Sequence, residues 1–516
     1  MLQAVYQDSS VEPPIVPPEP ELKRPWERHE AIRELVRGRM EVVGPATARA
    51  LAEFFLLSQT DIDAALLALE AEGFVLRGRF HPNATELEWC DRRLLARIHR
   101  LTINRLRAEI QPVSLADFQR FLLAWQRVDA GHRAEGPEGV EAVLELLDGY
   151  ELPAAAWEPE VLALRVKEYA PPWLDRLCFT GRIGWGRLVP PQNQKARAFT
   201  PLRSSPVSLF ARENLADWRE LSDAKGPPEL LPDTEQVLKT LSQAGALFFK
   251  EIVRQTGLLP SRVEQALGEL VAQGWVTADS FEGLRALLIP SEKRERFADV
   301  ERPRRHRTVT SVEFAGRWSL LRTPESNAGQ AGLTQKAEGG TRNEAGSLLT
   351  SAATREKAIE TYAGVLLRRY GIVFRRLLEK ESLKVSWFEL GRVYRRLEAR
   401  GEIRGGHFAS GVSGEQFALP EAVGLLRSTR KTKPTGELIA LSAADPLNLV
   451  GILTPGPRIT AIAANRVLLR DGVPIAALEA GQIVKLDAGA GEAGDRVIEH
   501  ALMVGKLPAA LRPYYA

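Results

Sequence analysis

One stretch, residues 386–408 (SWFELGRVYRRLEARGEIRGGHF), combines side-chain types that bind nucleic acids at a spacing that brings them together. At 100° per residue, one face of a helix over this stretch carries Phe388, Arg392, Arg395 and Arg396. Guanidinium groups bind phosphates, and an aromatic ring stacks on a base. Arg404 follows just after the helix and belongs to the same predicted surface. The alternative interpretation is an ordinary solvated face, because exposed helix faces are usually charged.

The opposite face of this helix is apolar, which predicts how the helix is positioned. Its members lie at i, i+3, i+4 and i+7 and are Leu390, Val393, Tyr394 and Leu397. Gly401 then ends the helix, as glycine does at a C′ position. A short strand-turn-strand over residues 402–408 follows. A recognition helix followed by a wing is therefore predicted.

The same pattern occurs twice more along the chain. In each copy a glycine lies four residues after the last apolar face residue, and a phenylalanine lies seven residues after that glycine. The earlier apolar faces are Ile62, Ala65, Leu66 and Leu69, and then Val263, Ala266, Leu267 and Leu270. The corresponding glycines and phenylalanines are Gly73 with Phe80, and Gly274 with Phe281. An internal repeat of a winged helix is predicted, a scaffold that docks on DNA in many proteins.

The outward face of the helix separates the third copy from the other two. In the first copy this face is Ala64, Leu67, Ala68 and Ala71, which predicts a helix buried on both sides. In the second copy it is Gln265, Gly268, Glu269 and Ala272, without a positive charge. The third copy is therefore predicted to contact DNA, and the first two are predicted to pack against other parts of the protein.

Two further segments are candidates for DNA contact. A basic helix over residues 86–110 places Arg93, Arg97 and Arg100 along one stripe. These arginines either contact phosphates or cover a neighbouring domain with their aliphatic stems. A basic tract at residues 302–307 is followed by Arg317 and Trp318, which suit a single strand or a phosphate backbone. The alternative for this tract is a solvated connector.

Composition limits the class of protein. The chain has 516 residues and a formal net charge of +3, so any DNA affinity must come from local patches. The two cysteines, Cys90 and Cys178, form no CxxC pattern, and the seven histidines form no metal-binding pair, so no metal is expected. Without a long apolar run or a charged-then-apolar leader, we expect a cytoplasmic protein with no membrane contact.

The expected fold class is α+β, a tandem array of winged-helix domains followed by a small C-terminal β-barrel. The barrel is predicted from six short strands of period two at close spacing. The predicted segments are a proline-rich linker (1–24), a winged helix (25–87), a basic helical connector (88–136), a divergent winged helix (137–222), a winged helix (228–300), a disordered loop (323–353), a basic winged helix (354–427) and the β-barrel (432–516). Because the chain begins on a linker-like segment, we expect it to be a piece of a longer protein.

Familiar catalytic motifs are missing from the sequence. It contains no GxxxxGK[ST], no GxSxG and no GxGxxG that opens a helix. Hydrolysis of ATP by a P-loop mechanism is therefore not expected of this chain, and no cofactor is predicted.

Several long blocks resemble the C-terminal region of bacterial large helicase-related (Lhr) proteins. The blocks are WCDRRLLARIHRLTINRLRAEIQPVSLADFQRFLLAWQ, WLDRLCFTGRIGWGRL, FAGRWSLL, GEQFALPEAVGLLR and DPLNLVGILTPG. The resemblance runs from about residue 26 to 510, and it implies an ATP-dependent DNA helicase core ahead of this region. It also implies tandem winged helices and a β-barrel, similar to winged-helix DNA glycosylases, with glycosylase action on uracil in DNA.

The resemblance implies one candidate catalytic residue. Asp445 in DPLNLVG corresponds to the Asp-Pro segment of the related glycosylases, where a carboxylate would activate water or steady an oxocarbenium-like sugar. The alternative is an Asx-type turn before Pro446. The chain departs from those enzymes because no Gln-x-Gln or Gln-x-Asp motif lies near FAGRWSLL.

Two functions remain open at this stage. The first is a DNA-binding, base-excising region of a repair helicase, with single-stranded or forked DNA and the helicase core of the same polypeptide as partners. The second is a non-catalytic DNA-binding and oligomerisation module, favoured by the apolar face around Leu67.

Overall fold

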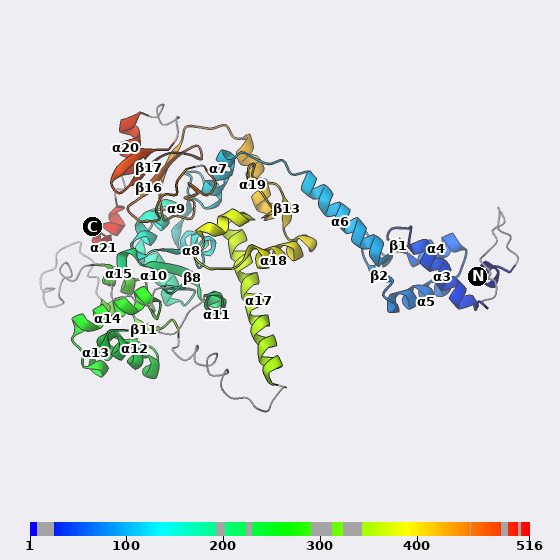
Figure 1. The fold of residues 1–516 in the computed structure, drawn as a ribbon, viewed down its shortest axis with the longest axis horizontal. Helices are drawn as coiled ribbons and strands as arrows, with labels where there is room; N and C mark the ends of the chain where they lie inside the picture. Colours follow the sequence, from blue (N-terminus) through cyan, green and yellow to red (C-terminus); the bar gives the residue numbers. More distant parts are fainter. Residues whose placement is uncertain are drawn as a thin grey trace. The chain divides into compact units, whose positions relative to one another are not determined.

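The structure is a computed structural model that describes residues 1–7, 25–191, 202–222, 230–289, 312–322, 343–454, 456–486, 494–503 and 507–515. These residues form two compact units, Met1–Glu109 and Ile110–Ala516. The first unit contains one winged helix, and the second contains three winged helices and a C-terminal module (Figure 1).

The first unit forms the winged helix of the first repeat copy. Its elements are α1 (Leu2–Val5), α3 (Arg28–Met40), β1 (Ala46–Thr47), α4 (Ala48–Phe55), α5 (Gln59–Ala71), β2 (Val75–Gly78), β3 (Glu88–Asp91) and α6 (Arg92–Ala108). Ser58 caps α5 through its hydroxyl, and all four predicted face residues of α5 are buried. The strands form an antiparallel sheet in the order β1-β3-β2. The opposite face is not buried, because Leu67 is 50% exposed, so the prediction of burial on both sides of α5 is wrong for this unit.

Residues 113–191 and 202–222 form the divergent winged helix at the start of the second unit, and this range begins ahead of the predicted start at residue 137. Its helical elements are α7 (Leu115–Trp125), α8 (Gly136–Leu146), η1 (Ala154–Ala156), the π-helix η2 (Trp157–Leu162), α9 (Ala163–Arg165), α10 (Pro171–Phe179), η3 (Leu202–Ser204), η4 (Arg212–Asn214) and α11 (Leu215–Leu221). Its strands are β4 (Ala134–Glu135), β5 (Glu151–Pro153), β6 (Val166–Lys167), β7 (Ile183–Gly186) and β8 (Pro206–Ala211). The main sheet has the order β5-β8-β7, and β4 pairs with β6 in parallel. The last strand therefore lies in the middle, as in the first unit.

The second repeat copy shares a core with the divergent winged helix. Its elements are α12 (Pro232–Ala244), β9 (Leu247–Phe248), α13 (Phe249–Thr256), α14 (Pro260–Gln273), β10 (Val276–Ala278), α15 (Glu282–Leu288), η7 (Val312–Phe314) and β11 (Arg317–Leu320). The sheet order is β10-β11-β9. Trp185 from β7 packs edge-to-face on both Phe281 and Trp318, with ring centroids 6.2 Å apart in each pair. One apolar cluster therefore spans both modules.

The third repeat copy forms the winged helix that carries the arginine-rich face. Its elements are α17 (Asn343–Tyr370), β12 (Ile372–Phe374), η10 (Arg375–Lys380), α18 (Trp387–Ala399), β13 (Arg404–Gly406), β14 (Gln416–Ala418) and α19 (Pro420–Lys431). The sheet order β12-β14-β13 again places the last strand in the centre. The glycine after the recognition helix has a positive φ in each repeat copy, at +71° for Gly73, +80° for Gly274 and +76° for Gly401. A residue with a Cβ would be strained there, which explains the recurring glycine.

The C-terminal module is an open sheet rather than the expected closed barrel. Its elements are β15 (Leu438–Ser442), β16 (Arg466–Arg470), β17 (Val473–Glu479), β18 (Gln482–Lys485), α20 (Asp495–Met503), η12 (Ala509–Leu511) and α21 (Arg512–Tyr515). The antiparallel order β15-β16-β17-β18 leaves β15 and β18 as edges among the described strands. Two of the six predicted strands, residues 449–453 and 459–464, instead form the irregular connection between β15 and β16. Four strands of this length are too few to close a small barrel.

Several segments named in the sequence analysis lie partly or wholly outside the residues that the structure describes. Residues 8–24 of the predicted linker, residues 323–342 of the predicted disordered loop and the basic tract 302–307 all lie outside them. The helix α17 already begins at Asn343, so the end of the predicted loop is helical. None of the described helices is long and apolar enough to cross a bilayer.

Candidate nucleic-acid face and interdomain cavity

Local sequence explains why α18 forms and which way it faces. Ser386 caps the helix, accepting from the Glu389 amide, while the Glu389 carboxylate accepts from the Ser386 amide at 3.0 Å. The apolar side is anchored by Leu390, Val393 and Tyr394, which are buried. The Tyr394 hydroxyl donates to the Ala363 carbonyl at 3.2 Å. These contacts turn the other side of α18 toward solvent.

The solvent side of α18 presents a ring and free guanidinium groups. Phe388 is 71% exposed. Arg392 and Arg404 are exposed and, within the described part of the chain, make no hydrogen bond or ion pair. We call these three residues the α18 face. An exposed phenylalanine on the same helix as an unpaired arginine, with a second unpaired arginine on the following wing, is an unusual use of a folded surface unless a ligand covers it.

The other two predicted arginines of α18 are already paired with carboxylates. Arg395 binds Glu415 on the wing at 2.7 Å. Arg396 binds Glu356 at 3.2 Å and also contacts Glu360, both from α17. A phosphate would have to displace these partners, so Arg395 and Arg396 contribute less free charge than their spacing suggests.

The wing that carries Arg404 is held by buried polar side chains. The Gln416 amide oxygen accepts from the Phe408 and Ala409 amides at 2.9 Å each, and its NH₂ donates to the Ala409 carbonyl at 3.1 Å. The Glu398 carboxylate of α18 accepts from the Gly405 amide at 3.1 Å. Since both side chains are buried, these hydrogen bonds fix the wing relative to α18.

The remaining sequence-predicted contacts are placed elsewhere. Arg93, Arg97 and Arg100 are exposed on α6 of the first unit. In the second unit, Arg317 is half exposed and binds Asp279 at 2.9 Å. Trp318 is fully buried against Trp185, so the prediction that it stacks on a base is wrong. A strand alternates its side chains, and Arg317 takes the outward position while Trp318 takes the core.

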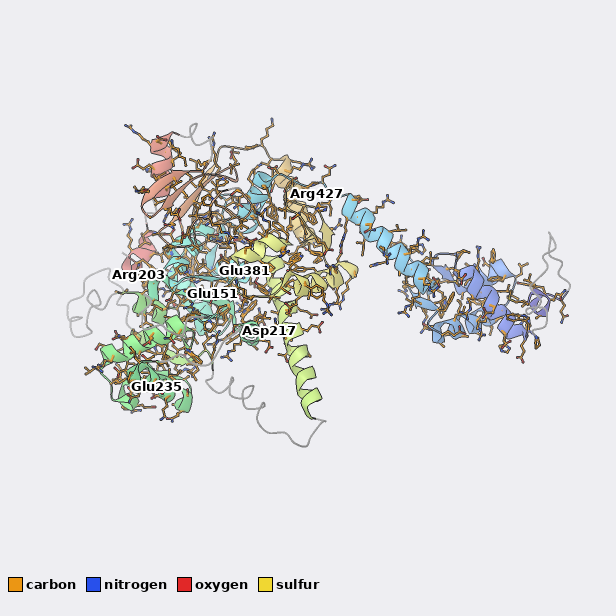
Figure 2. All side chains as sticks on the ribbon, in the orientation of Figure 1. Glu151, Arg203, Asp217, Glu235, Glu381 and Arg427 are labelled. Atoms are coloured by element: carbon orange, nitrogen blue, oxygen red, sulfur yellow. The ribbon has the colours of Figure 1, made fainter. Side chains whose placement is uncertain are left out.

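A cavity of about 440 Å³ lies where three modules of the second unit meet, and we call it the three-module cavity. The divergent winged helix contributes Tyr150, Glu151, Leu152, Pro153, Ser204 and Pro206; the basic winged helix contributes Glu379, Lys380 and Ser382; and the C-terminal module contributes Ala444, Asn448, Val450, Ile452, Arg458, Ile459, Thr460 and Ala461. Its size falls in the range of ligand pockets, roughly 300–1,000 Å³. Figure 2 labels Glu151, which lines the cavity, and Glu381, which follows the cavity residue Lys380 in the chain.

Lys380, which lines this cavity, has a strongly altered acidity. Burial lowers its pKa to about 8, although Asp445 and Glu381 act in the opposite direction. Both carboxylates already have arginine partners. Glu381 contacts Arg369 and accepts from the Tyr370 hydroxyl at 2.8 Å. Lys380 itself makes no hydrogen bond or ion pair to the described residues.

Asp445 lies beside the cavity and holds the C-terminal module to the divergent winged helix. Its two carboxylate oxygens accept from Arg165 at 2.7 and 2.9 Å, and both side chains are fully buried. The same carboxylate accepts from the Leu447 amide at 2.9 Å, which is the Asx turn considered above. Arg165 also donates to Gln126 at 3.0 Å. The carboxylate is therefore committed to structural partners.

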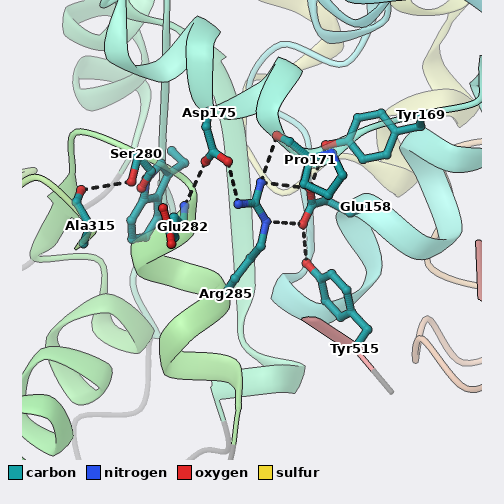
Figure 3. A network of polar contacts seen from close by, with 10 residues as sticks. Glu158, Tyr169, Pro171, Asp175, Ser280, Glu282, Arg285, Ala315 and Tyr515 are labelled. Carbon is teal, nitrogen blue, oxygen red and sulfur yellow. Dashed lines mark hydrogen bonds and ion pairs between the residues drawn. The ribbon is translucent and has the colours of Figure 1, made fainter. Parts of the chain in front are cut away.

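A second buried network joins the chain's last helix to two winged helices (Figure 3). Arg285 donates to Glu158 at 2.6 and 3.0 Å and to Asp175 at 2.6 Å. The hydroxyls of Tyr169 and Tyr515 each donate to Glu158 at 2.7 Å. Burial raises the pKa of Asp175, although the Arg285 charge opposes this. The network fixes the relative position of these modules.

Sequence reasoning missed the cavity and its residues. Lys380, Tyr150 and Asn448 stand in no recognisable motif and are separated by up to 298 positions. Among the described residues, no group of histidines, cysteines and carboxylates could hold a metal ion.

Comparisons with known proteins explain this arrangement. Residues 352–438 and residues 113–211 each match a family model described as "Large helicase-related protein, winged-helix domain". Both segments are therefore similar to winged-helix domains of large helicase-related proteins. The two matched segments are the basic and the divergent winged helix, which flank the three-module cavity.

Two Lhr relatives align over most of the chain. It is 28% identical over 496 residues to a Mycolicibacterium smegmatis protein named "Lhr helicase/ probable uracil glycosylase", covering 91% of this chain and 30% of that protein. It is 26% identical over 475 residues to an Escherichia coli protein named "Lhr helicase/uracil glycosylase", covering 83% of this chain and 27% of that protein. The chain thus spans less than a third of each relative and corresponds to the C-terminal region of Lhr proteins.

Proposed function

We propose that this chain is a DNA-binding region of an Lhr-type helicase, and that the α18 face makes the principal contact with DNA. The observation that carries the proposal is the exposed Phe388 on a recognition helix together with two exposed, unpaired arginines, one on that helix and one on its wing. The helicase domain named in both relatives would be the partner within the same polypeptide.

Each member of the α18 face has a distinct role in this proposal. Arg392 on the helix and Arg404 on the wing bind phosphates on either side of a groove or fork. Phe388 stacks on an unpaired base, a contact worth about 1–3 kcal/mol. Because single-stranded and forked DNA expose base faces, they are expected to bind more tightly than a blunt duplex.

The test is the salt dependence of binding to a fluorescent forked oligonucleotide. The Arg392→Ala/Arg404→Ala variant should bind more weakly and lose about one unit of salt slope for each phosphate contact removed, about two in all. Arg254→Ala on α13, exposed and unpaired in the described structure, is the matched control. An unchanged slope in the double variant, or an equal loss in the control, would refute the role of the α18 face.

We further propose that the three-module cavity receives an extruded base for excision. The cavity volume, its mixed apolar and polar lining and the glycosylase named in both relatives support this assignment. In such a reaction, water adds to C1′ as the bond between C1′ and the base breaks, and the base leaves with a proton from that water. Uracil in DNA is the first substrate to examine, since both relatives' names specify it.

Filling the mouth of the cavity tests this second step. Ala461 is exposed and lines the cavity, so Ala461→Trp should block entry without disturbing the fold. Ala464→Trp, also exposed but away from the lining, is the control. The readout is strand cleavage by alkali after incubation with a uracil-containing oligonucleotide. Equal cleavage by both variants would exclude the cavity, and no cleavage by the unmodified chain would exclude uracil excision altogether.

Self-association is a second candidate role, favoured by the first unit. Its exposed apolar side chains include Leu56 at 88%, Val42 at 74% and Phe54 at 56%. Such exposure is typical of surfaces that contact another protein. Light scattering of the full chain at high concentration tests this role, and a strict monomer would remove it.

A further inference from the structure

Lys380 is a partly buried amine that makes no hydrogen bond or ion pair with the described residues. It lies at the end of η10, where the buried Leu377 on one side and Glu381 on the other fix the backbone. Asp445 and Glu381, the two carboxylates that act on Lys380 electrostatically, are each bound by a buried arginine. The Lys380 amine therefore lines the three-module cavity without a direct ion-pair partner among the described residues.

We propose that Lys380 is the nucleophile of an abasic-site lyase centre in the three-module cavity. This inference rests on the proposed binding of DNA and extends the proposed base excision to the strand itself. Three observations carry it: a lysine on a rigid element, a cavity of ligand size around it, and carboxylate neighbours already bound by arginines.

The substrate is a deoxyribose that has lost its base, whose ring-opened form has an aldehyde at C1′. The Lys380 amine attacks this carbon, and the resulting carbinolamine loses water to give an iminium ion. A neutral amine is needed for the attack, and burial supplies it by lowering the pKa of Lys380 to about 8. At this stage one C–N bond has formed and one water has been released.

The iminium ion makes the C2′ proton acidic and so permits strand scission. Glu379 lines the same cavity and is the carboxylate placed to accept that proton. The electron pair forms the C2′–C3′ double bond while the C3′–O bond breaks and the 3′ phosphate leaves. Glu379 is paired with Arg458, and its protonation in this step neutralises that ion pair and frees Arg458, which also lines the cavity, to bind the departing anion. Water then hydrolyses the imine and frees Lys380, so no oxidant or reductant is consumed.

Borohydride trapping tests the proposal directly. The full chain is incubated with an oligonucleotide that contains one abasic deoxyribose, sodium borohydride is added, and the covalent complex is quantified on a denaturing gel. Mass spectrometry of the digested complex identifies the attached lysine. We expect the unmodified chain to be trapped at Lys380, with scission of the strand in the absence of borohydride.

Variants that keep the positive charge distinguish a Lys380 that acts as a nucleophile from a Lys380 that only supplies a positive charge. Lys380→Arg retains the positive charge but cannot form the imine, so trapping should fall at least about 100-fold while affinity for abasic DNA stays within about threefold. Lys384→Arg, four residues later on the same segment and exposed, is the matched control and should be trapped like the unmodified chain. Lys380→Met provides a second, apolar replacement of similar length.

The outcomes distinguish this inference from the proposed function. Attachment at another lysine or at the N-terminal amine, or full trapping of Lys380→Arg, overturns the lyase assignment. Binding of abasic DNA without any trapping also overturns it and leaves DNA binding intact. Failure of the unmodified chain to bind either intact or abasic DNA in an anisotropy assay instead refutes the proposed function on which the inference rests.

Discussion

Replacing Asp445 by asparagine is expected to destabilise the attachment of the C-terminal module to the divergent winged helix, and not only to affect base excision. The substitution removes the negative partner of Arg165 and leaves a guanidinium charge in a site where both side chains are fully buried. Removing one member of a buried ion pair costs about 3–5 kcal/mol. Because the pair joins two modules, this cost should appear as local opening of the connection between β15 and β16.

Hydrogen–deuterium exchange of peptides from residues 438–470 measures that opening. Since about 1.4 kcal/mol corresponds to a tenfold change, Asp445→Asn should accelerate exchange of the protected amides by roughly 10²- to 10⁴-fold. Combining it with Arg165→Met removes the stranded charge and should recover most of the protection.

A second ion pair between the same two modules is the matched control. Arg466 binds Glu160 at 2.8 Å, but both side chains are partly exposed, so solvent screens the pair. Glu160→Gln should change exchange by less than about tenfold, equivalent to roughly 1 kcal/mol or less. If Asp445→Asn behaves like Glu160→Gln, the reasoning from burial is refuted. If Asp445→Asn also loses base excision, the exchange measurement decides whether that loss follows from opening of the C-terminal module or from a catalytic role of the carboxylate.

Three shorter predictions follow from burial and acidity. Leu66→Ala on α5 should destabilise the first unit by about 2–5 kcal/mol, because Leu66 is buried, whereas Leu67→Ala on the exposed face should cost less than about 1 kcal/mol. Hydrogen–deuterium exchange of the α5 amides in the full chain compares the two variants, and similar effects would contradict the assignment of Leu66 to the buried face and Leu67 to the exposed face. Borohydride trapping of Lys380 should rise about tenfold per pH unit and level off near pH 8, because only the neutral amine attacks the aldehyde. The charges that face this amine are those of Asp445, Glu381 and Arg458. A flat profile of trapping between pH 6 and 8 would argue against titration of Lys380. Gln416→Leu should leave buried amides of the wing unpaired at a cost of about 1–3 kcal/mol each and weaken DNA binding, and wild-type affinity would show that the wing is dispensable.

The repeat of helix, glycine and wing could be predicted from the sequence because its signals are local. Apolar residues at i, i+3, i+4 and i+7 must share a helix face, and the face residues of α5 and α14 are buried as expected. A glycine after each helix is required by a positive φ, which depends on neighbouring backbone atoms alone. The exposure of Phe388 and Arg392 follows from the same periodicity.

Only the tertiary structure decided which candidate side chains remain available. Trp318 and Phe388 are both aromatic residues near arginines in the sequence, yet one lies in a core and the other faces solvent. Arg395 looks equivalent to Arg392 until Glu415 on the wing is brought against it. Such outcomes depend on contacts between elements that no local spacing encodes.

The three-module cavity shows the same limit over longer distances. Arg165 meets Asp445 across 280 residues, and this pairing commits the carboxylate that the sequence offered as a catalytic candidate. With Asp445 and Glu381 both bound to arginines, Lys380 is left as the unpaired amine of the cavity. The sequence determined the elements through short-range periodicity and backbone geometry, whereas burial and charge pairing between distant modules determined which groups can act.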